Sequence, residues 1–431
     1  MKTIMLISPY LMTAKTFLTG ALLDSLLSGD NVKIHLVVPD EFELSENFWH
    51  DNRRVERHSI IRWKNQGSVF LRLYFFLGFV IHLCLVYRFN SLSRFSGFGN
   101  RVKQSLGQKF RELLEGIPSF RIFGFPLPQS VTFYKAIQHF YYRWFCRSKS
   151  VERMMTSIRP DVLVIFHCQN HPGLFYTRAA LKNNIRTMGV IGSWDQPTTK
   201  GPIYENLDDV LTPNAFVKEE LIRWHGVLNE ITHVFGWPQL DSYFDERAIT
   251  KKKNIQVHLG IEADQGYLVF GAYGGRLGKN EENLISSIAH FLENNIAFKN
   301  IFLLVRPHPL DLKSESRYSE LLGKPKVIIE TQRMREHLCL PEILRNSIGV
   351  ISSGGTILLD GLASDIPALG IAFERDAENF YECSARRFEM EHWRTAISLG
   401  CIIIASNVKE LQQNILNLVT VKSRSKLYAY E

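Results

Sequence analysis

The sequence predicts an α/β protein with two domains, each built around a parallel β-sheet. Short β-branched or apolar runs alternate with helical patterns along most of the chain, and this alternation is typical of strands joined by crossover helices. The 431 residues are enough for two domains of roughly 200 residues each. We predict a first domain at 1–236, a linker at 237–265, a second domain at 266–406, and a helix with a tail at 407–431.

Composition and cysteine spacing narrow the class of protein. A hydrophobic content of 45% and a charged content of 22% are ordinary for a globular chain. The six cysteines lie far apart and form no C-x-x-C pair, which argues against a zinc site or a disulfide framework and favours a reducing compartment. The apolar run within residues 1–10 is too short for a secretory signal, so we expect it to form the first strand.

The first domain begins with a strand–helix–strand unit. Residues 3–7 and 32–38 are apolar and rich in β-branched side chains, and residues 14–27 between them carry a helical pattern. A polar loop at 39–52 follows the second strand, at the end of the sheet where α/β proteins usually bind ligands. Further strands are predicted within 159–166 and at 187–191, 210–212 and 232–235, with helices at 131–156, 174–183 and 213–224.

One region of the first domain carries most of the positive charge. Residues 57–149 contain 15 Lys and Arg against 2 Asp and Glu, in a chain whose net charge is +8. Residues 69–88 are the most apolar stretch, but only about 15 apolar-dominated residues lie between its arginines, and a spanning helix needs roughly 20. A helix lying in an anionic membrane interface and a buried helix with a solvated basic neighbour fit equally well. We treat 57–150 as a helical, basic and aromatic insert. No nucleic-acid-binding motif occurs, so we expect no nucleic-acid partner.

The second domain repeats the alternation of strands and helices. Three turns marked by glycine or proline follow predicted strands, at 271–279, 306–309 and 352–356. Because the carboxyl ends of parallel strands meet at one edge of a sheet, we expect these turns to lie together. Strands are predicted at 266–270, 301–305, 326–329, 349–351, 368–373 and 401–405, and helices at 280–294, 341–346, from 357 onward and at 408–418.

The turn at 352–356, Ser-Ser-Gly-Gly-Thr, has the chemistry of an anion site. Glycines let the backbone approach a ligand, small hydroxyls donate or accept hydrogen bonds, and the N–H groups of the following helix favour negative charge. Arg276, Lys279 and Arg306 add positive charge. His308 adds a donor that can become charged, and Asp360 is placed to accept from a sugar hydroxyl. We interpret this set as a site for a nucleoside diphosphate, although an ordinary strand–turn–helix unit is the alternative.

The order of these motifs resembles bacterial nucleotide-sugar-dependent glycosyltransferases that build surface polysaccharides such as capsule and lipopolysaccharide. Those enzymes have the GT-B architecture, in which two Rossmann-like domains face a cleft. The sequence is also similar to CDP-glycerol glycerophosphotransferases and nucleotide-sugar 2-epimerases, which share that architecture. The resemblance spans 159–416, omits 50–150, and rests on residues 193–201, Gly-Trp-Pro at 236–238 with Asp241, Arg-Pro-His-Pro at 306–309, and 352–367. Many sugar transferases have Glu where Asp360 stands.

The resemblance implies a nucleotide-sugar donor site in the second domain, an acceptor site in the first, and catalysis in the cleft between them. Positive side chains and helix dipoles usually stabilise the leaving diphosphate in this architecture, so it implies no tightly bound metal and no cofactor. The donor residues would be Gly274, Gly275, Arg276, Lys279, Arg306, His308, Ser352, Ser353, Gly354, Gly355, Thr356 and Asp360.

An inverting transferase also needs a base for the acceptor hydroxyl. Asp195, His167 and His171 are the best-placed candidates in the first domain. Asp195 leads because it lies beside Trp194 in a loop bounded by glycine and proline, although an aspartate that caps a turn fits the pattern nearly as well.

The leading hypothesis is a glycosyltransferase that moves a sugar to a lipid-linked or polysaccharide acceptor. We expect it in the cytoplasm, peripheral on the inner face of the cytoplasmic membrane and attracted to anionic lipid. The alternatives are a CDP-glycerol-type glycerophosphotransferase, a nucleotide-sugar 2-epimerase, and a non-catalytic membrane-bound component of polysaccharide assembly. The basic insert counts against the epimerase, which needs no membrane patch. The phosphate-site residues count against the non-catalytic component.

Overall fold

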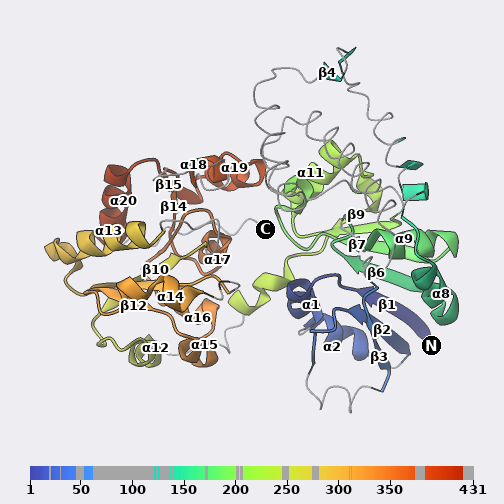
Figure 1. Ribbon diagram of the computed structural model, residues 1–431, viewed down its shortest axis with the longest axis horizontal. Coiled ribbons are helices and arrows are strands. Elements are labelled where there is room, and N and C mark those ends of the chain that lie inside the picture. The colour runs from blue at the N-terminus through green and yellow to red at the C-terminus, as the bar shows by residue number, and fades with distance from the viewer. Residues whose placement is uncertain are drawn as a thin grey trace. The chain divides into compact units, whose positions relative to one another are not determined.

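The computed structural model divides into two compact units, which we call unit 1 (Met1–Gln239) and unit 2 (Leu240–Glu431). In Figure 1 unit 1 runs from blue to yellow-green and unit 2 from yellow to red. The residues that the structure describes are 1–18, 21–29, 31–44, 53–61, 121–122, 125–126, 136, 139–140, 142–144, 146–169, 173–199, 203, 207–244, 252–273, 281–309, 311, 313–373 and 384–420.

Unit 1 contains a seven-stranded sheet in which all neighbouring strands are parallel. Three of its strands, at residues 2–7, 32–38 and 162–166, are mainly apolar runs, as expected for strands covered on both faces. The order across the sheet is β3 (Val55–Ser59), β2 (Val32–Val38), β1 (Lys2–Ile7), β6 (Val162–Phe166), β7 (Arg186–Val190), β8 (Asp209–Thr212) and β9 (Thr232–Val234). A separate antiparallel pair joins β4 (Arg121–Ile122) to β5 (Phe125–Pro126).

Helices pack against the unit 1 sheet. Leu6 and Leu36 share a buried cluster with Phe17 of α1 (Leu11–Leu18), whereas Ile165 contacts the start of α9 (Gly173–Lys182). The other helical elements that the structure describes in unit 1 are α2 (Ala21–Leu27), α8 (Lys149–Ile158), α10 (Gln196–Thr199), α11 (Ala215–Glu220), a π-helix at Leu221–His225 and a 3₁₀ turn at Asn229–Ile231. A further 3₁₀ turn, Pro238–Tyr243, spans the boundary between the two units.

Unit 2 contains a six-stranded sheet whose neighbouring strands are all parallel. Tyr267, Leu268, Val269 and Phe270 on a central strand are all 0% exposed, which fits the continuous apolar pattern of a strand buried on both faces. The order is β12 (Val327–Ile329), β11 (Ile301–Arg306), β10 (Gly266–Gly271), β13 (Val350–Ser352), β14 (Ala368–Ile371) and β15 (Ile402–Ala405).

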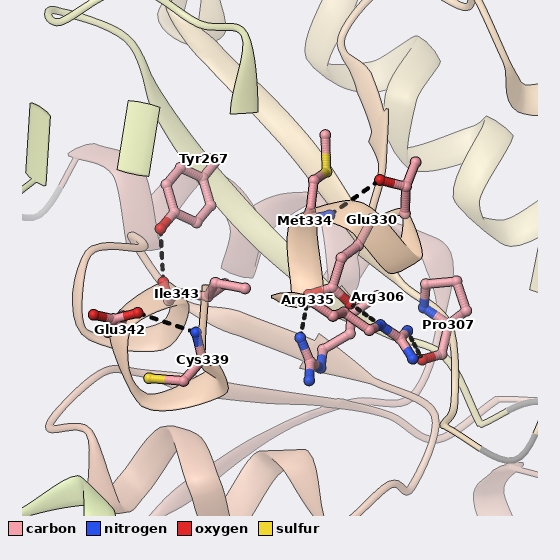
Figure 2. Close-up of polar contacts among 10 residues, drawn as sticks. Tyr267, Arg306, Pro307, Glu330, Met334, Arg335, Cys339, Glu342 and Ile343 are labelled. Carbon is pink, nitrogen blue, oxygen red and sulfur yellow. Dashed lines mark hydrogen bonds and ion pairs between the residues drawn. The ribbon is translucent and has the colours of Figure 1, made fainter. Parts of the chain in front are cut away.

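Helices lie on both faces of the unit 2 sheet (Figure 1). Leu268 and Phe270 share a core with α13 (Glu281–Glu293) and α20 (Val408–Thr420). Tyr267 points the other way, and its hydroxyl donates to the Ile343 carbonyl at 2.7 Å (Figure 2). The other helical elements are α12 (Lys252–Leu259), α14 (Ser314–Arg317), α15 (Gln332–His337), α16 (Leu340–Arg345), α17 (Ile357–Ala363), α18 (Ser384–Phe388) and α19 (Glu391–Ser398), with 3₁₀ turns at Ile296–Phe298 and Ser319–Leu321.

The predicted fold class is confirmed, because each unit has a Rossmann-like parallel sheet with crossover helices. The helix predicted at 14–27 begins earlier and forms two helices, α1 and α2. β3 is not predicted from the sequence, because Glu56, Arg57 and His58 hide its strand pattern. The proposed membrane segment at 69–88 lies outside the described residues. Within the part of the chain that is described, no helix is both long and apolar enough to span a membrane.

Candidate functional site

The carboxyl ends of four strands form one row in unit 2. Gly271, the last residue of β10, pairs with Arg306 of β11 on one side and with Ser352 of β13 on the other. Ser352 in turn pairs with Gly370 of β14. The turns that begin after β10, β11 and β13 therefore start side by side, at the edge where parallel sheets usually bind ligands.

Two glycines at this edge are required by close packing. A Cβ atom on Gly271 would lie 2.3 Å from Cγ2 of Ile357, so the first turn of α17 can approach β10 only over a glycine. Gly354 has a φ of +124°, and a Cβ there would lie 3.0 Å from Cδ of Arg387. The turn between β13 and α17 therefore depends on glycine both for its backbone conformation and for its contact with Arg387.

The two serines of this turn form internal hydrogen bonds. The Ser352 hydroxyl donates to the Gly271 carbonyl at 2.7 Å and accepts from the Gly355 N–H at 3.1 Å. The Ser353 hydroxyl donates to Oε1 of Glu281 at 2.7 Å. Both serines are buried, whereas Thr356 is exposed. The serines thus fix the shape of the turn, and Thr356 presents its side chain to solvent.

A buried arginine also donates hydrogen bonds to the turn between β13 and α17. Arg387 of α18 is 4% exposed. Its Nη1 donates to the Ser353 carbonyl at 2.9 Å and to the Ser353 hydroxyl at 3.3 Å. Its guanidinium lies 4.4 Å from the centroid of the Tyr273 ring, and the Tyr273 N–H donates to the Glu281 carboxylate. Ser353 therefore contacts both a positive guanidinium and a negative carboxylate.

Glu330 links two arginines beside β11 (Figure 2). Its side chain is 0% exposed and accepts from Nη1 of Arg306 and, at 2.9 Å, from Nε of Arg335. Arg335 also donates to the Pro307 carbonyl at 2.6 Å. Burial lowers the pKa of Arg306, and the Glu330 charge opposes that effect. The ion pair with Glu330 thus already offsets part of the positive charge that Arg306 brings to this edge of the sheet.

Asp360 of α17 is buried next to Tyr243 and Arg306. Its residue exposure is 8%. Burial raises the pKa of its carboxyl group to about 6, while a hydrogen bond from the Tyr243 hydroxyl and the charge of Arg306 act in the opposite direction. The same burial, with the adjacent Asp360 carboxylate, raises the pKa of Tyr243. The carboxylate expected to bind a sugar hydroxyl thus accepts a hydrogen bond from a tyrosine of the protein itself.

His308 lies on the turn that follows β11. Burial of the imidazole lowers its pKa, Asp311 opposes that shift, and Arg335 adds to it. In its neutral form the imidazole of His308 can offer one N–H donor and one acceptor.

In unit 1, Asp195 lies directly before α10. Its carbonyl accepts from the N–H and the hydroxyl of Thr198, at 3.1 and 3.0 Å. Its carboxylate accepts from the hydroxyl of Ser193. The carbonyl contacts place Asp195 in the turn that precedes α10, while its carboxylate contacts a serine side chain. Its role as a catalytic base stays a prediction.

His167 follows the last residue of β6 with a φ of +57°. Its ring stands edge-on to Tyr10, with 5.7 Å between the ring centroids. A Cβ on Gly192 would lie 3.2 Å from Nε2 of His167, so the ring packs against the loop after β7. The remaining predicted site residues lie outside the described part of the chain: His171, Gly274, Gly275, Arg276 and Lys279.

Several residues at the edge of unit 2 are not predicted from the sequence. Glu281 is the second residue of the helix predicted at 280–294, and its position near the start of that helix gives the only local signal. Tyr243 follows the Gly-Trp-Pro motif by a few residues, but nothing in the sequence places it near Asp360. Glu330, Arg335 and Arg387 belong to no motif, so only the structure brings them to the turn.

No protein-family model matches the sequence, and no curated protein matches it. Solved structures do match. A UDP-GlcNAc 2-epimerase from Methanocaldococcus jannaschii has a TM-score of 0.52 and 12% identity, over 98% of this chain and 94% of its own. The UDP-GlcNAc 2-epimerase from Neisseria meningitidis bound to UDP-GlcNAc has a TM-score of 0.52 and 10% identity, over 97% and 91%. MnaA of S. aureus with UDP has a TM-score of 0.51 and 12% identity, over 97% and 88%.

These likenesses extend along nearly the whole chain, but the identities are low, so what they show is the fold. The chain has the GT-B-like fold, with two Rossmann-like domains. Among the proteins that share it are UDP-GlcNAc 2-epimerases, one of the three groups that the sequence resembles.

Proposed function

We propose that the protein is an enzyme that binds a nucleoside-diphosphate sugar at the carboxyl edge of the unit 2 sheet. The observation that carries this proposal is the row formed by Gly271, Arg306 and Ser352. It brings a glycine-dependent turn to the same edge of the sheet as a partly buried arginine. Backbone N–H groups of such a turn and a guanidinium both suit phosphate oxygens.

The polar groups around the edge suit the uncharged part of the same ligand. His308 and Thr356 offer donors and acceptors for hydroxyl groups or a base. Asp360 already accepts from Tyr243, but a carboxylate has two oxygens and several lone pairs, so one remains for a ribose hydroxyl. Two of the similar structures hold UDP or UDP-GlcNAc, which supports the same class of ligand.

The first candidate for the reaction is epimerisation of the sugar at C2. The support is that UDP-GlcNAc 2-epimerases match this chain over nearly its full length. Glycosyl transfer to a membrane-borne acceptor is the second candidate. The observation that favours it is the excess of 15 basic over 2 acidic residues at 57–149, which suits a protein held peripherally at an anionic membrane surface.

One experiment separates the two reactions. Inversion at C2 breaks the C2–H bond, so an epimerase working in D₂O incorporates deuterium at C2 and produces the C2 epimer without any acceptor. The purified protein is incubated with UDP-GlcNAc in D₂O and followed by proton NMR. Loss of the C2 proton signal supports epimerisation. If UDP-GlcNAc binds the protein but keeps its C2 proton, the epimerase proposal is wrong. Glycosyl transfer then remains as the candidate reaction.

The second candidate is tested with acceptor present. Protein and labelled UDP-GlcNAc are incubated with bacterial membrane extract, and label in the lipid fraction is measured. Transfer that depends on the protein supports the glycosyltransferase. Protein that binds CDP in preference to UDP would instead point to the CDP-glycerol-type reaction.

A further inference from the structure

Three potential metal ligands meet on the two outermost strands of the unit 1 sheet. β3 is the edge strand and β2 lies beside it. His35 pairs with Glu56 across the two strands, and Val37 pairs with His58. Paired residues of parallel strands point to the same face, and residues two apart on one strand share that face. The side chains of His35, Glu56 and His58 therefore gather on one side of the sheet.

The ligating atoms are close together. Nδ1 of His35 lies 2.8 Å from Nε2 of His58 and 3.4 Å from Oε2 of Glu56. One ligating atom from each of the three residues lies within 4.8 Å of the other two. The two imidazole rings are stacked, with 5.1 Å between centroids and 19° between planes. His35 is 4% exposed, so the cluster is partly shielded from water.

These separations can be compared with those around a tetrahedral metal. Zn–N and Zn–O bonds of about 2.0–2.1 Å place two ligand atoms about 3.3 Å apart. The separation of 3.4 Å between His35 and Glu56 meets that requirement. The two histidine nitrogens, now 2.8 Å apart and hydrogen bonded, need to separate by about half an ångström. Each ring must also carry its proton on its other nitrogen, which requires only a change of tautomer.

A neighbouring lysine orients the carboxylate of Glu56. The ammonium group of Lys33 lies 2.5 Å from Oε1 of Glu56. Oε1 is therefore occupied, and Oε2 is the oxygen turned toward His35. Lys33 fixes the orientation of the carboxylate in this way.

We propose that His35, His58 and Glu56 bind one Zn²⁺ ion, with water at the fourth position. Two imidazoles and one carboxylate form a donor set that Zn²⁺ accepts in proteins, whereas Mg²⁺ and Ca²⁺ prefer oxygen ligands alone. The ion ties the edge strand β3 to β2. The proposal is independent of the nucleotide site, because every ligand belongs to unit 1.

The test uses the full-length protein without a histidine tag, stripped with a chelator and titrated with Zn²⁺ by calorimetry. We expect one ion per chain and a melting temperature that rises with Zn²⁺ but not with Mg²⁺. His58→Gln and Glu56→Gln, which alter the two less buried ligands, should each weaken binding by at least about tenfold. Far-UV circular dichroism checks that both variants fold.

A matched control comes from unit 2. The rings of His258 and His337 are also stacked, with 5.4 Å between centroids and 14° between planes. The double variant His258→Gln/His337→Gln should bind Zn²⁺ like the unchanged protein. The proposal is overturned if the protein takes up no Zn²⁺, if folded His58→Gln keeps its full affinity, or if the control variant is the one that loses binding.

Discussion

The hydroxyl of Tyr243 donates a hydrogen bond to the buried carboxyl group of Asp360. Tyr243 ends a 3₁₀ turn at the start of unit 2, and Asp360 lies in α17. Burial raises the pKa of Asp360 to about 6, although the hydrogen bond and the charge of Arg306 both favour the ionised form. Desolvation is therefore the dominant influence on this carboxylate.

We expect Asp360→Asn to change how stability depends on pH. Folding raises this pKa from its ordinary value of 3.8 to about 6, so the stability that the carboxyl contributes is present below about pH 4 and is lost as pH rises through about 6. The free energy of unfolding of the unchanged protein, relative to Asp360→Asn, should fall by up to about 3 kcal/mol between pH 4 and pH 7. Denaturant unfolding at a series of pH values measures this difference.

Asp365→Asn is the matched control for that measurement. Asp365 is an exposed aspartate just beyond the same helix, and its φ of +56° is one that asparagine also tolerates. Its pH profile should run parallel to that of the unchanged protein. Parallel profiles for Asp360→Asn as well would show that Asp360 does not titrate with a raised pKa.

Glu330→Gln should strongly destabilise unit 2. The change removes the buried negative charge that Arg306 and Arg335 share, and an uncompensated buried charge typically costs about 3–5 kcal/mol. Glu336→Gln, an exposed change in the neighbouring α15, should alter stability by less than about 0.5 kcal/mol. Differential scanning calorimetry compares the two, and equal melting temperatures would contradict the role assigned to Glu330.

Gly354→Ala tests the packing of the turn against Arg387. The variant adds a Cβ atom where φ is +124° and where Cδ of Arg387 lies 3.0 Å away, so we expect a loss of about 3 kcal/mol or more. Gly400→Ala is the control, because Gly400 has a φ of +70° but no atom within 4 Å of the added Cβ. It should lose only about 1–2 kcal/mol. If denaturant titrations give the same loss of unfolding free energy for both variants, crowding against Arg387 does not add to the cost of Gly354→Ala.

Much of the fold could be predicted because buried parallel strands are continuous apolar runs. Tyr267 to Phe270 is such a run, and all four residues are fully buried. β3 is not predicted because it is an edge strand, and its Glu56 and Arg57 are exposed while His58 is only half-buried, so no apolar pattern marks it. The cluster of His35, Glu56 and His58 is not predicted either, because only the register between β2 and β3 brings these residues together.

Only those features of the candidate site that depend on neighbouring residues in the sequence could be predicted. Glycine at 354 and 355 marks the turn, and the order of strands predicts that it lies beside Arg306. The direction of the side chains does not follow from the sequence. Ser352 and Ser353 bond to the protein rather than facing outward, and Arg387 reaches the turn from a helix 34 residues further along the chain.

The proposed function depends most directly on whether a nucleoside diphosphate binds the edge that carries Thr356. Thr356→Glu places a negative charge on this exposed turn position, next to the predicted phosphate site. Ala297→Glu adds the same charge on an exposed turn just before β11 begins, at the opposite end of the sheet. Neither change removes a buried contact, so both variants should fold.

Isothermal titration calorimetry with UDP, GDP and CDP makes the measurement. We expect one of these ligands to bind the unchanged protein with one site per chain. Ala297→Glu should bind it equally well, and Thr356→Glu at least about tenfold more weakly, a difference of about 1.4 kcal/mol. No binding of any nucleoside diphosphate, or full affinity in Thr356→Glu, would contradict the account.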